Sequence, residues 1–419
     1  MGCPFGVSLS SVKVSQTLIA VDSPLGSFLP PDRTSHALFR HRCGQRGGRG
    51  RPANPPGNLE NVQLFDRLAA DDYEQVVFCQ DNGTGLRAII AIHDTTLGPA
   101  LGGTRFFPYG SDDEALDDVL RLAKGMSYKS AAAGLDLGGG KAVIVGDPAK
   151  VKTESLLRAY GRFVDALGGR YITAEDVGTT QADMDLIRRE TRCVTGVSRS
   201  LGGSGDPSAA TAYGVMHGMK AVASKLWGDT SLAGRHVVVS GVGKVGYSLV
   251  RHLVEERARV TVTDVVPAAV ERAVKDFGIE ATPVDSAHQV ACDIYSPCAM
   301  GKALSPVTIP ELACTAVVGS ANNQLADETC APLLEDKVVV YAPDYIVNAG
   351  GVINIAEELV GYHRERAYSN VRRIFDTTLA VLDTAENEGI TTALAADRVA
   401  ERRMVELARI HQIRTFHER

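Results

Sequence analysis

The chain has 419 residues, 44% hydrophobic and 22% charged, with a formal net charge of -6 at pH 7. This length exceeds one ordinary hydrophobic core, so two domains are expected in a globular protein of normal composition. The sequence has no apolar run of about 18 residues that would predict a membrane span. The acidic balance gives no reason to expect a nucleic-acid partner, which calls for a clustered basic face.

Residues 1–57 differ in composition from the rest, with seven Lys or Arg and two Asp. From about Arg40 to Gly57 the segment is dominated by Arg, Gly and Pro. It cannot bury enough apolar surface to offset the entropy lost on ordering, so a disordered basic tail is predicted. A targeting or nucleic-acid arm is the functional alternative. We favour a dispensable tail, translated from a start codon placed too far upstream.

The N-terminus carries no recognisable targeting signal: no apolar segment precedes a convincing cleavage site, and Gly6 stands where a myristoylation signal has Ser or Thr. The cysteines are scattered, with no CxxC pair, which fits reduced thiols in a cytoplasmic enzyme and predicts no metal site. Cys298 has no indicated His partner, so packing is favoured over a nucleophilic role. The eight cysteines are Cys3, Cys43, Cys79, Cys193, Cys292, Cys298, Cys314 and Cys330.

The predicted ordered part begins near residue 59. Two β-branched runs, Val76–Gln80 and Arg87–His93, flank Asp-Asn-Gly-Thr-Gly and predict a hairpin. Ser111 then caps a helix, with Glu114 at the reciprocal capping-box position. The apolar stripe of this helix is expected to be core rather than a chemical site; its members are Leu116, Val119, Leu120, Ala123 and Met126.

Glycines surround a lysine at Gly134–Lys141, directly before the predicted strand Ala142–Val145. This is not the Walker pattern, because no Ser or Thr follows the lysine at a helix start. The glycines are expected to let the backbone approach a ligand, with Lys141 pointing into the same space. A helix at Thr153–Leu167 and a strand at Arg170–Ala174 follow.

From about Pro207 onward, β/α alternation predicts a parallel, doubly wound domain. A helix at 209–227, a strand at 235–240, a helix to about 256 and a strand at 259–264 open it, and the alternation runs to about Ala342. The stretch from Asn348 to Arg419 is strongly helical in pattern.

A complete GxGxxG motif follows the strand at 235–240 and opens a helix. Its glycines permit a tight turn and close approach of a pyrophosphate, and the helix N-terminus attracts phosphate. Asp264 ends the next strand, where a carboxylate accepts hydrogen bonds from the ribose and repels a 2′-phosphate, so NAD is expected rather than NADP. The motif residues are Gly241, Val242, Gly243, Lys244, Val245 and Gly246.

Two lysines, Lys129 and Lys141, lie among glycines and alanines. A lysine in such surroundings can be desolvated and become a general base, although a snorkelling surface charge explains the pattern equally well. Asp176 at a strand end is a plausible acid/base partner, but by itself would more often cap a helix. From these residues alone both readings stay open.

The stretch from about Tyr73 to Gly361 resembles the Glu/Leu/Phe/Val dehydrogenase family, specifically its leucine and valine dehydrogenases. The segments that carry the resemblance are Ala91–Arg105, Gly125–Lys129, Gly134–Lys141, Tyr171–Gly178 and Tyr341–Gly351.

The resemblance implies an α/β fold of two domains, with the C-terminal helices packing back on the first. The implied plan is a tail at 1–57, a substrate and oligomerisation domain at 58–205, a Rossmann NAD-binding domain at 206–342, and returning helices at 343–419. A homo-oligomer acting on an amino acid, its 2-oxo acid and ammonia is also implied.

The resemblance also implies roles for individual residues. Lys141 matches the catalytic lysine, Lys129 the lysine that binds the substrate carboxylate, and Asp176 the aspartate in proton transfer. Backbone of Gly102 and Gly103 lines the substrate site. Three asparagines, Asn322, Asn323 and Asn348, lie near the nicotinamide, with Asn323 also near the substrate carboxylate.

The side-chain pocket implied by the resemblance is aliphatic, formed by Leu101, Ala174, Val352 and Ile355. Leu101 stands where glutamate-specific members have a lysine, and leucine cannot compensate a buried carboxylate. The expected activity is therefore reversible oxidative deamination of leucine, valine or isoleucine, which differ too little to be distinguished by sequence. Phenylalanine dehydrogenase activity, or a non-catalytic NAD-binding regulator on the same fold, are the alternatives.

Overall fold

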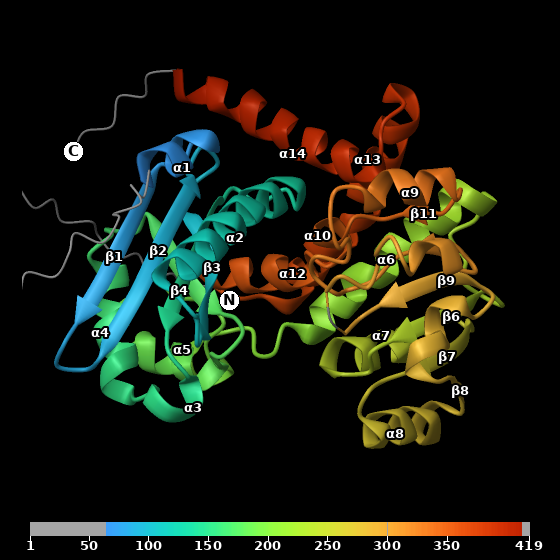
Figure 1. The fold of residues 1–419 in the computed structure, drawn as a ribbon, viewed down its shortest axis with the longest axis horizontal. Coiled ribbons are helices and arrows are strands. Elements are labelled where there is room, and N and C mark those ends of the chain that lie inside the picture. The colour runs from blue at the N-terminus through green and yellow to red at the C-terminus, as the bar shows by residue number, and fades with distance from the viewer. Residues whose placement is uncertain (1–63, 300, 413–419) are drawn as a thin grey trace, which may run out of the picture. The chain divides into compact units, whose positions relative to one another are not determined.

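The computed structural model describes residues 64–299 and 301–412 (Figure 1). The predicted basic tail, 1–57, lies outside the described residues. The described residues form one compact unit. Within the described ranges, no helix combines the length and apolarity needed to cross a membrane.

The first half of the described chain builds a mixed five-stranded sheet in the order β1-β2-β4-β3-β5. Strands β1, β2 and β4 pair antiparallel, whereas β3 runs parallel to both β4 and β5. The elements are α1 (Leu64–Ala70), β1 (Gln75–Asp81), β2 (Leu86–Asp94), β3 (Ala100–Phe107), α2 (Asp112–Ala132), β4 (Gly138–Val145), α3 (Pro148–Val151), α4 (Glu154–Asp165), β5 (Tyr171–Glu175) and α5 (Gln181–Ile187). The predicted hairpin is confirmed as β1 and β2.

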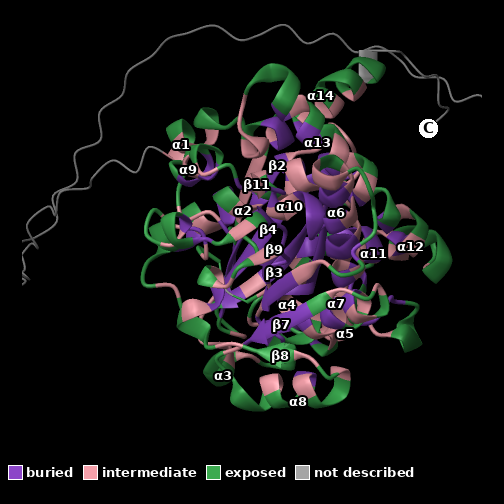
Figure 2. Ribbon diagram, turned by 90° about the vertical axis from the view of Figure 1, so that its right-hand side faces the viewer, coloured by how far each residue is buried: buried purple, intermediate pink, exposed green. Residues whose placement is uncertain are grey.

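Helices cover both faces of this sheet because its strands alternate apolar side chains toward each face. Ile89, Ala91 and Val143 pack against α2. Ile90, Ala142 and Ile144 point the other way and pack against α4 and α5. Figure 2 shows the buried residues concentrated in the strands and in helix α6 (Ser208–Trp227), whereas helix α8 (Pro267–Phe277) is largely exposed.

Helix α2 begins where the capping pattern predicts, although the capping box is altered. The Ser111 hydroxyl accepts a hydrogen bond from the Glu114 amide at 3.1 Å. The Glu114 carboxylate accepts from the Gly110 amide at 2.8 Å rather than from Ser111. The Glu114 carboxylate therefore accepts from the amide of the residue before Ser111, one position earlier than a reciprocal capping box requires.

The second half builds a parallel six-stranded sheet in the order β11-β10-β9-β6-β7-β8. Numbered from its first strand this is 3-2-1-4-5-6, the doubly wound dinucleotide-binding order, which reverses between β6 and β9. The elements are α6 (Ser208–Trp227), β6 (His236–Ser240), α7 (Lys244–Glu255), β7 (Arg259–Thr263), α8 (Pro267–Phe277), β8 (Glu280–Ala281), β9 (Cys292–Pro297), β10 (Cys314–Val317), α9 (Cys330–Asp336) and β11 (Val340–Tyr341).

The C-terminal helices pack back on the first sheet and its helix, as expected. Ala395, Ala396 and Ala400 of α14 share an apolar cluster with Ala131 and Ala132 of α2. A second cluster joins first-sheet residues to α11, α12 and α13. These elements are α10 (Asp344–Val347), α11 (Gly350–Ala356), α12 (Arg364–Arg372), α13 (Ile374–Glu388) and α14 (Thr392–Ala408).

The glycine tract before Lys141 differs from its interpretation as a ligand cradle. Residues Gly138–Gly140 belong to strand β4 itself, and protein atoms fill the space beside them. A Cβ at Gly138 would lie 2.1 Å from the Asp94 carbonyl oxygen, and one at Gly139 would lie 2.0 Å from the Ser127 amide nitrogen. The glycines are therefore explained by the close approach of α2 and a neighbouring loop to β4.

This packing predicts that Gly139→Ala lowers the free energy of unfolding by about 1–3 kcal/mol, because backbone atoms of α2 must move. The matched control is Gly125→Ala on α2, where a Cβ meets no atom within 4 Å. That change should raise stability by up to about 1 kcal/mol through helix propensity. Urea unfolding followed by circular dichroism measures both. Equal stability of Gly139→Ala and the parent chain would contradict the packing argument.

Candidate active site

A cavity of about 860 Å³ brings together residues from the first sheet, α2, the loop after β10 and helices α10 and α11. It is lined by every substrate-side residue predicted from the sequence and by three predicted asparagines on the cofactor side. These residues are Leu101, Gly102, Gly103, Lys129, Lys141, Ala174, Asp176, Asn322, Asn323, Asn348, Val352 and Ile355.

Strand register explains how the first-sheet residues converge. Gly103 pairs with Ala174 across β3 and β5, and Thr104 pairs with Ala142 across β3 and β4, so Gly103 lies beside Lys141. Side chains two residues apart share a face of a strand. Leu101, Ala174 and Lys141 therefore all point to the face that α2 covers. Asp176 follows directly after β5 on the same side.

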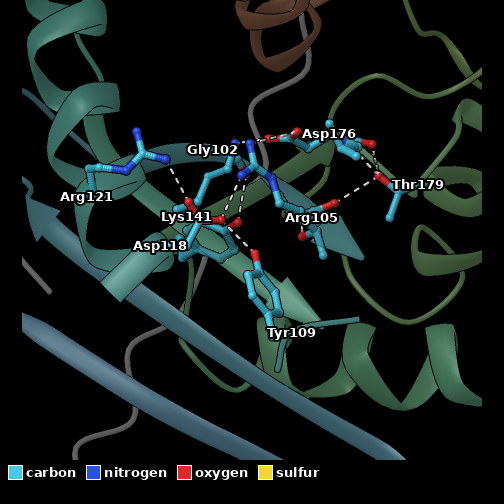
Figure 3. A network of polar contacts seen from close by, with 12 residues as sticks. Gly102, Arg105, Tyr109, Asp118, Arg121, Lys141, Asp176 and Thr179 are labelled. Carbon is cyan, nitrogen blue, oxygen red and sulfur yellow. Dashed lines mark hydrogen bonds and ion pairs between the residues drawn. The ribbon is translucent and has the colours of Figure 1, made fainter. Parts of the chain in front are cut away.

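Lys141 forms an ion pair with Asp176 at the floor of the cavity (Figure 3). The lysine is only 6% exposed. Burial opposes ionisation of the Asp176 carboxyl, but the charges of Lys141 and Arg105 outweigh it and hold its pKa below the ordinary value. The Val177 amide also donates to this carboxylate at 2.5 Å. Asp176 is therefore a buried carboxylate kept in its charged form.

Lys129 projects from α2 into the same cavity and reaches the other half of the site. Its ammonium donates to Asn348 Oδ1 at 2.6 Å. The Asn348 amide nitrogen donates to Asn322 Oδ1 at 2.8 Å and to the Ser320 carbonyl at 3.2 Å. An ammonium can only donate, so the oxygen of Asn348 must face Lys129. Asn348 thus connects α2 with the loop after β10.

The pKa values of Lys129 and of its neighbour Asp344 are perturbed. Burial, followed by the charge of Lys141, lowers the pKa of Lys129 to about 8 against the opposing pull of Asp344 and Asp176. Burial raises the pKa of Asp344, although the Gln324 amide donates to its carboxylate at 2.8 Å. A lysine in a cavity whose pKa lies near neutral pH can bind an anion or exchange a proton.

One wall of the cavity is aliphatic. Leu101 and Val352 belong to one apolar cluster that joins the first sheet to α11, and Met126 packs against it. Ala174 is buried beside them, and Ile355 is half-buried. The buried members of this cluster are all aliphatic. The wall can hold a branched aliphatic side chain, whereas its aliphatic residues cannot pair with a charged side chain.

Gly102 and Gly103 bring backbone to the cavity wall. A Cβ at Gly102 would lie 1.7 Å from the Gly140 carbonyl oxygen, and one at Gly103 would lie 2.5 Å from the Glu175 carbonyl oxygen. The Gly102 carbonyl also accepts a hydrogen bond from the Tyr171 hydroxyl at 2.7 Å. Neither position has room for a side chain, so only main-chain atoms of β3 line the site here.

The glycine motif between β6 and α7 has the features that a dinucleotide requires. Gly241 has a φ of 106°, and a Cβ at Gly246 would lie 1.9 Å from the Gly241 carbonyl oxygen. A Cβ at Gly243 meets no atom within 4 Å. The outer glycines thus shape the turn and pack the helix, while Gly243 faces open space where a pyrophosphate can approach.

Helix α7 and Asp264 complete this fit. No side chain caps α7 at Gly243, which leaves its first N–H groups free to bind phosphate. The Asp264 carboxylate, after β7, accepts from the Val242 amide at 2.7 Å and the Val266 amide at 2.9 Å. It is thereby fixed beside the glycine turn. Of the six motif residues only Val245 also lines the cavity.

Several cavity residues were not identified from the sequence. Arg105, Asp344, Tyr128 and Tyr345 line it, as do Asp397 and Glu401 from α14. The Tyr128 hydroxyl donates to Glu401 at 2.8 Å and the Tyr345 hydroxyl to Asp397 at 2.7 Å. Arg105 could have been found from the strand alternation that begins at Leu101, whereas the contacts of α14 leave no local signal.

Comparison with known proteins identifies the family. The family model described as Glu/Leu/Phe/Val dehydrogenase, dimerisation domain, matches residues 73–193. The model for Glutamate/Leucine/Phenylalanine/Valine dehydrogenase matches 202–270 and 265–412. Leucine dehydrogenase of Thermoactinomyces intermedius is 56% identical over 82% of this chain and 94% of its own length. Valine dehydrogenase of Streptomyces virginiae is 54% identical over 79% and 94%.

Solved structures agree. L-Tryptophan dehydrogenase from Nostoc punctiforme superposes with a TM-score of 0.75 at 43% identity, covering 83% of this chain and 100% of that one. The hetero-hexameric glutamate dehydrogenase from Thermus thermophilus gives 0.66 at 26%, covering 82% and 91%. The predicted two-domain α/β fold is confirmed, and a nicotinamide cofactor accords with the fold and family. The chain belongs to the Glu/Leu/Phe/Val dehydrogenase family and is an amino-acid dehydrogenase.

Proposed function

We propose that this enzyme catalyses the reversible, NAD-dependent oxidative deamination of a branched-chain L-amino acid to its 2-oxo acid and ammonia. The observation that carries this proposal is one cavity in which the Lys141–Asp176 pair and Lys129 face an aliphatic wall. The similarity to leucine and valine dehydrogenases, at 56% and 54% identity, supports the same substrate class.

In this proposal Lys129 binds the substrate α-carboxylate. Its ammonium is partly buried and now donates to a neutral amide oxygen, which a carboxylate can replace with a stronger, charge-assisted hydrogen bond. Backbone of Gly102 and Gly103 bounds the substrate, and the aliphatic wall takes its side chain. These contacts fix Cα for the reaction.

Lys141 and Asp176 handle protons. A nicotinamide held beside Asn322, Asn323 and Asn348 would supply a hydride acceptor for Cα, and the substrate would then be an iminium. Water must then add to this carbon, and Lys141 takes the proton that the water loses. Asp176, ion-paired with Lys141, can relay the proton that Lys141 took from water to the departing amine. Asn322, Asn323 and Asn348 lie on the cofactor side of the cavity and position the nicotinamide.

Asp264 favours NAD. Both carboxylate oxygens accept main-chain hydrogen bonds beside the glycine turn, and their remaining lone pairs can accept the ribose hydroxyls. A 2′-phosphate would meet this fixed negative charge. We further propose a homo-oligomer assembled through the first sheet, since the matching family model for residues 73–193 is described as a dimerisation domain.

A substrate panel tests the proposal directly. With purified full-length enzyme, leucine, valine and isoleucine should give kcat/KM values roughly 10²-fold above glutamate, because the wall has no partner for a second carboxylate. NAD should support faster turnover than NADP. Turnover of glutamate alone would overturn the branched-chain assignment, and preference for phenylalanine or tryptophan would replace it with an aromatic one.

Lys141→Ala should lower kcat by roughly 10³-fold, because the proton acceptor for the attacking water is lost. Lys150→Ala is the matched control: that lysine is 79% exposed, and among the described residues it forms an ion pair only with Asp147, three residues away. It should retain the parent activity. Turnover of Lys141→Ala within about tenfold of the parent enzyme would show that Lys141 is not the base.

Carboxylate binding should weaken at alkaline pH. Because the pKa of Lys129 is lowered to about 8, its charge is present below that pH and lost above it. The inhibition constant of 4-methylpentanoate, which has no amine to titrate, should rise up to about tenfold per pH unit above that point. Lys129→Met should bind weakly at every pH. A pH-independent constant in the parent enzyme would contradict the role of Lys129.

A further inference from the structure

Arg105 joins the Lys141–Asp176 pair to helix α2. It stands on β3, two residues beyond Gly103 on the same face, and its side chain is 22% exposed. One terminal nitrogen donates to Asp118 at 2.7 Å, and the other lies 3.7 Å from an Asp176 oxygen. Figure 3 shows the guanidinium between the two carboxylates.

Asp118 holds this arginine in a fixed orientation. The Asp118 carboxylate lies on α2 and is 16% exposed. It accepts hydrogen bonds from the Tyr109 hydroxyl and from Arg121, both at 2.7 Å. The Nε of Arg105 is buried with no hydrogen-bond partner among the described residues. The Arg105 guanidinium therefore contacts Asp118 with one terminal nitrogen and Asp176 with the other. It thus bridges α2 and the floor of the cavity.

We propose that Arg105 is a positioning residue that keeps Asp176 ionised and aimed at Lys141 when Lys141 gives up its proton. This inference rests on the proposed function. When Lys141 is neutral, the buried Asp176 carboxylate loses its closest positive charge, and burying an unpaired charge is costly. Arg105 remains charged at every working pH and supplies the compensating charge from the other side.

The other charges around Asp176 do not replace Arg105. Lys141 on β4, Arg105 on β3 and Lys129 on α2 face it with positive charge, and Glu175 on β5 is its negative neighbour. Lys129 donates to Asn348 and is the group assigned to the substrate carboxylate. Arg105 is thus the cation committed to Asp176 throughout turnover.

The test separates electrostatic positioning from a simple tie between β3 and α2. Competitive acetylation of Lys141, followed by mass spectrometry of the full-length protein across pH, reports its protonation without needing turnover. In Arg105→Met the midpoint of labelling should move up by about one pH unit, since a nearby cation is lost. The acid limb of kcat in deamination should move the same way, with kcat lower by roughly 10²-fold.

Conservative and control variants sharpen the result. Arg105→Lys should restore the labelling midpoint but not the full kcat, because lysine lacks the planar fork that spans two carboxylates. Arg121→Met removes the other arginine on Asp118, 56% exposed, and should leave the midpoint unchanged. Asp118→Asn keeps the cation but frees it, so kcat should fall without an upward shift of the midpoint.

The outcomes distinguish this inference from the proposed function. A folded Arg105→Met protein with the parent midpoint overturns the role of Arg105, even if Lys141→Ala is inactive. An active Lys141→Ala protein overturns the base assignment, while a shifted midpoint would still establish the electrostatic coupling. If Arg105→Met does not fold, Asp118→Asn carries the test, and a parent value of its kcat overturns the anchoring.

Discussion

The ion pair between Lys141 and Asp176 joins β4 to the segment after β5 across the strand between them. Removing two charges from water costs on the order of several kcal/mol per ion, which only close geometry and further partners repay. β3 lies between the strands that carry the two residues, and its glycines let backbone pack tightly there. Arg105, anchored by Asp118, supplies the second positive charge. Packing and electrostatics therefore serve the same site.

A single amide connects the two halves of the site. Asn348 accepts from Lys129 of α2 and donates to Asn322 and Ser320 after β10. Helix α2 and the loop after β10 are thus connected by hydrogen bonds through this side chain. A ligand that displaced the Asn348 oxygen from Lys129 would leave that oxygen free to accept a different hydrogen bond beside the loop after β10.

Local structure was predictable from the sequence wherever residue periodicity or a capping pattern determines a helix or a strand. The β1–β2 hairpin, the start of α2 at Ser111 and the βαβ unit around Gly241–Gly246 follow from sequence. The interpretation of Gly138–Gly140 as a ligand cradle was wrong. By sequence alone, a glycine that makes room for a ligand cannot be distinguished from one that makes room for a helix. The site residues came mainly from family resemblance, since spacing alone left Lys129 and Lys141 ambiguous. Their convergence on one cavity accords with the proposed roles.

The sequence by itself determined the parallel nucleotide-binding unit, its Asp264 and the aliphatic Leu101, because these depend on short-range patterns and on residue type. Only the tertiary structure decided which charges meet. Lys129 and Asn348 are 219 residues apart, and Tyr128 and Glu401 are 273 apart. Such contacts arise from strand register and from the return of the C-terminal helices, so no local pattern encodes them. The lowered pKa of Lys129 has the same origin, because burial and neighbouring charge exist only once the cavity has formed.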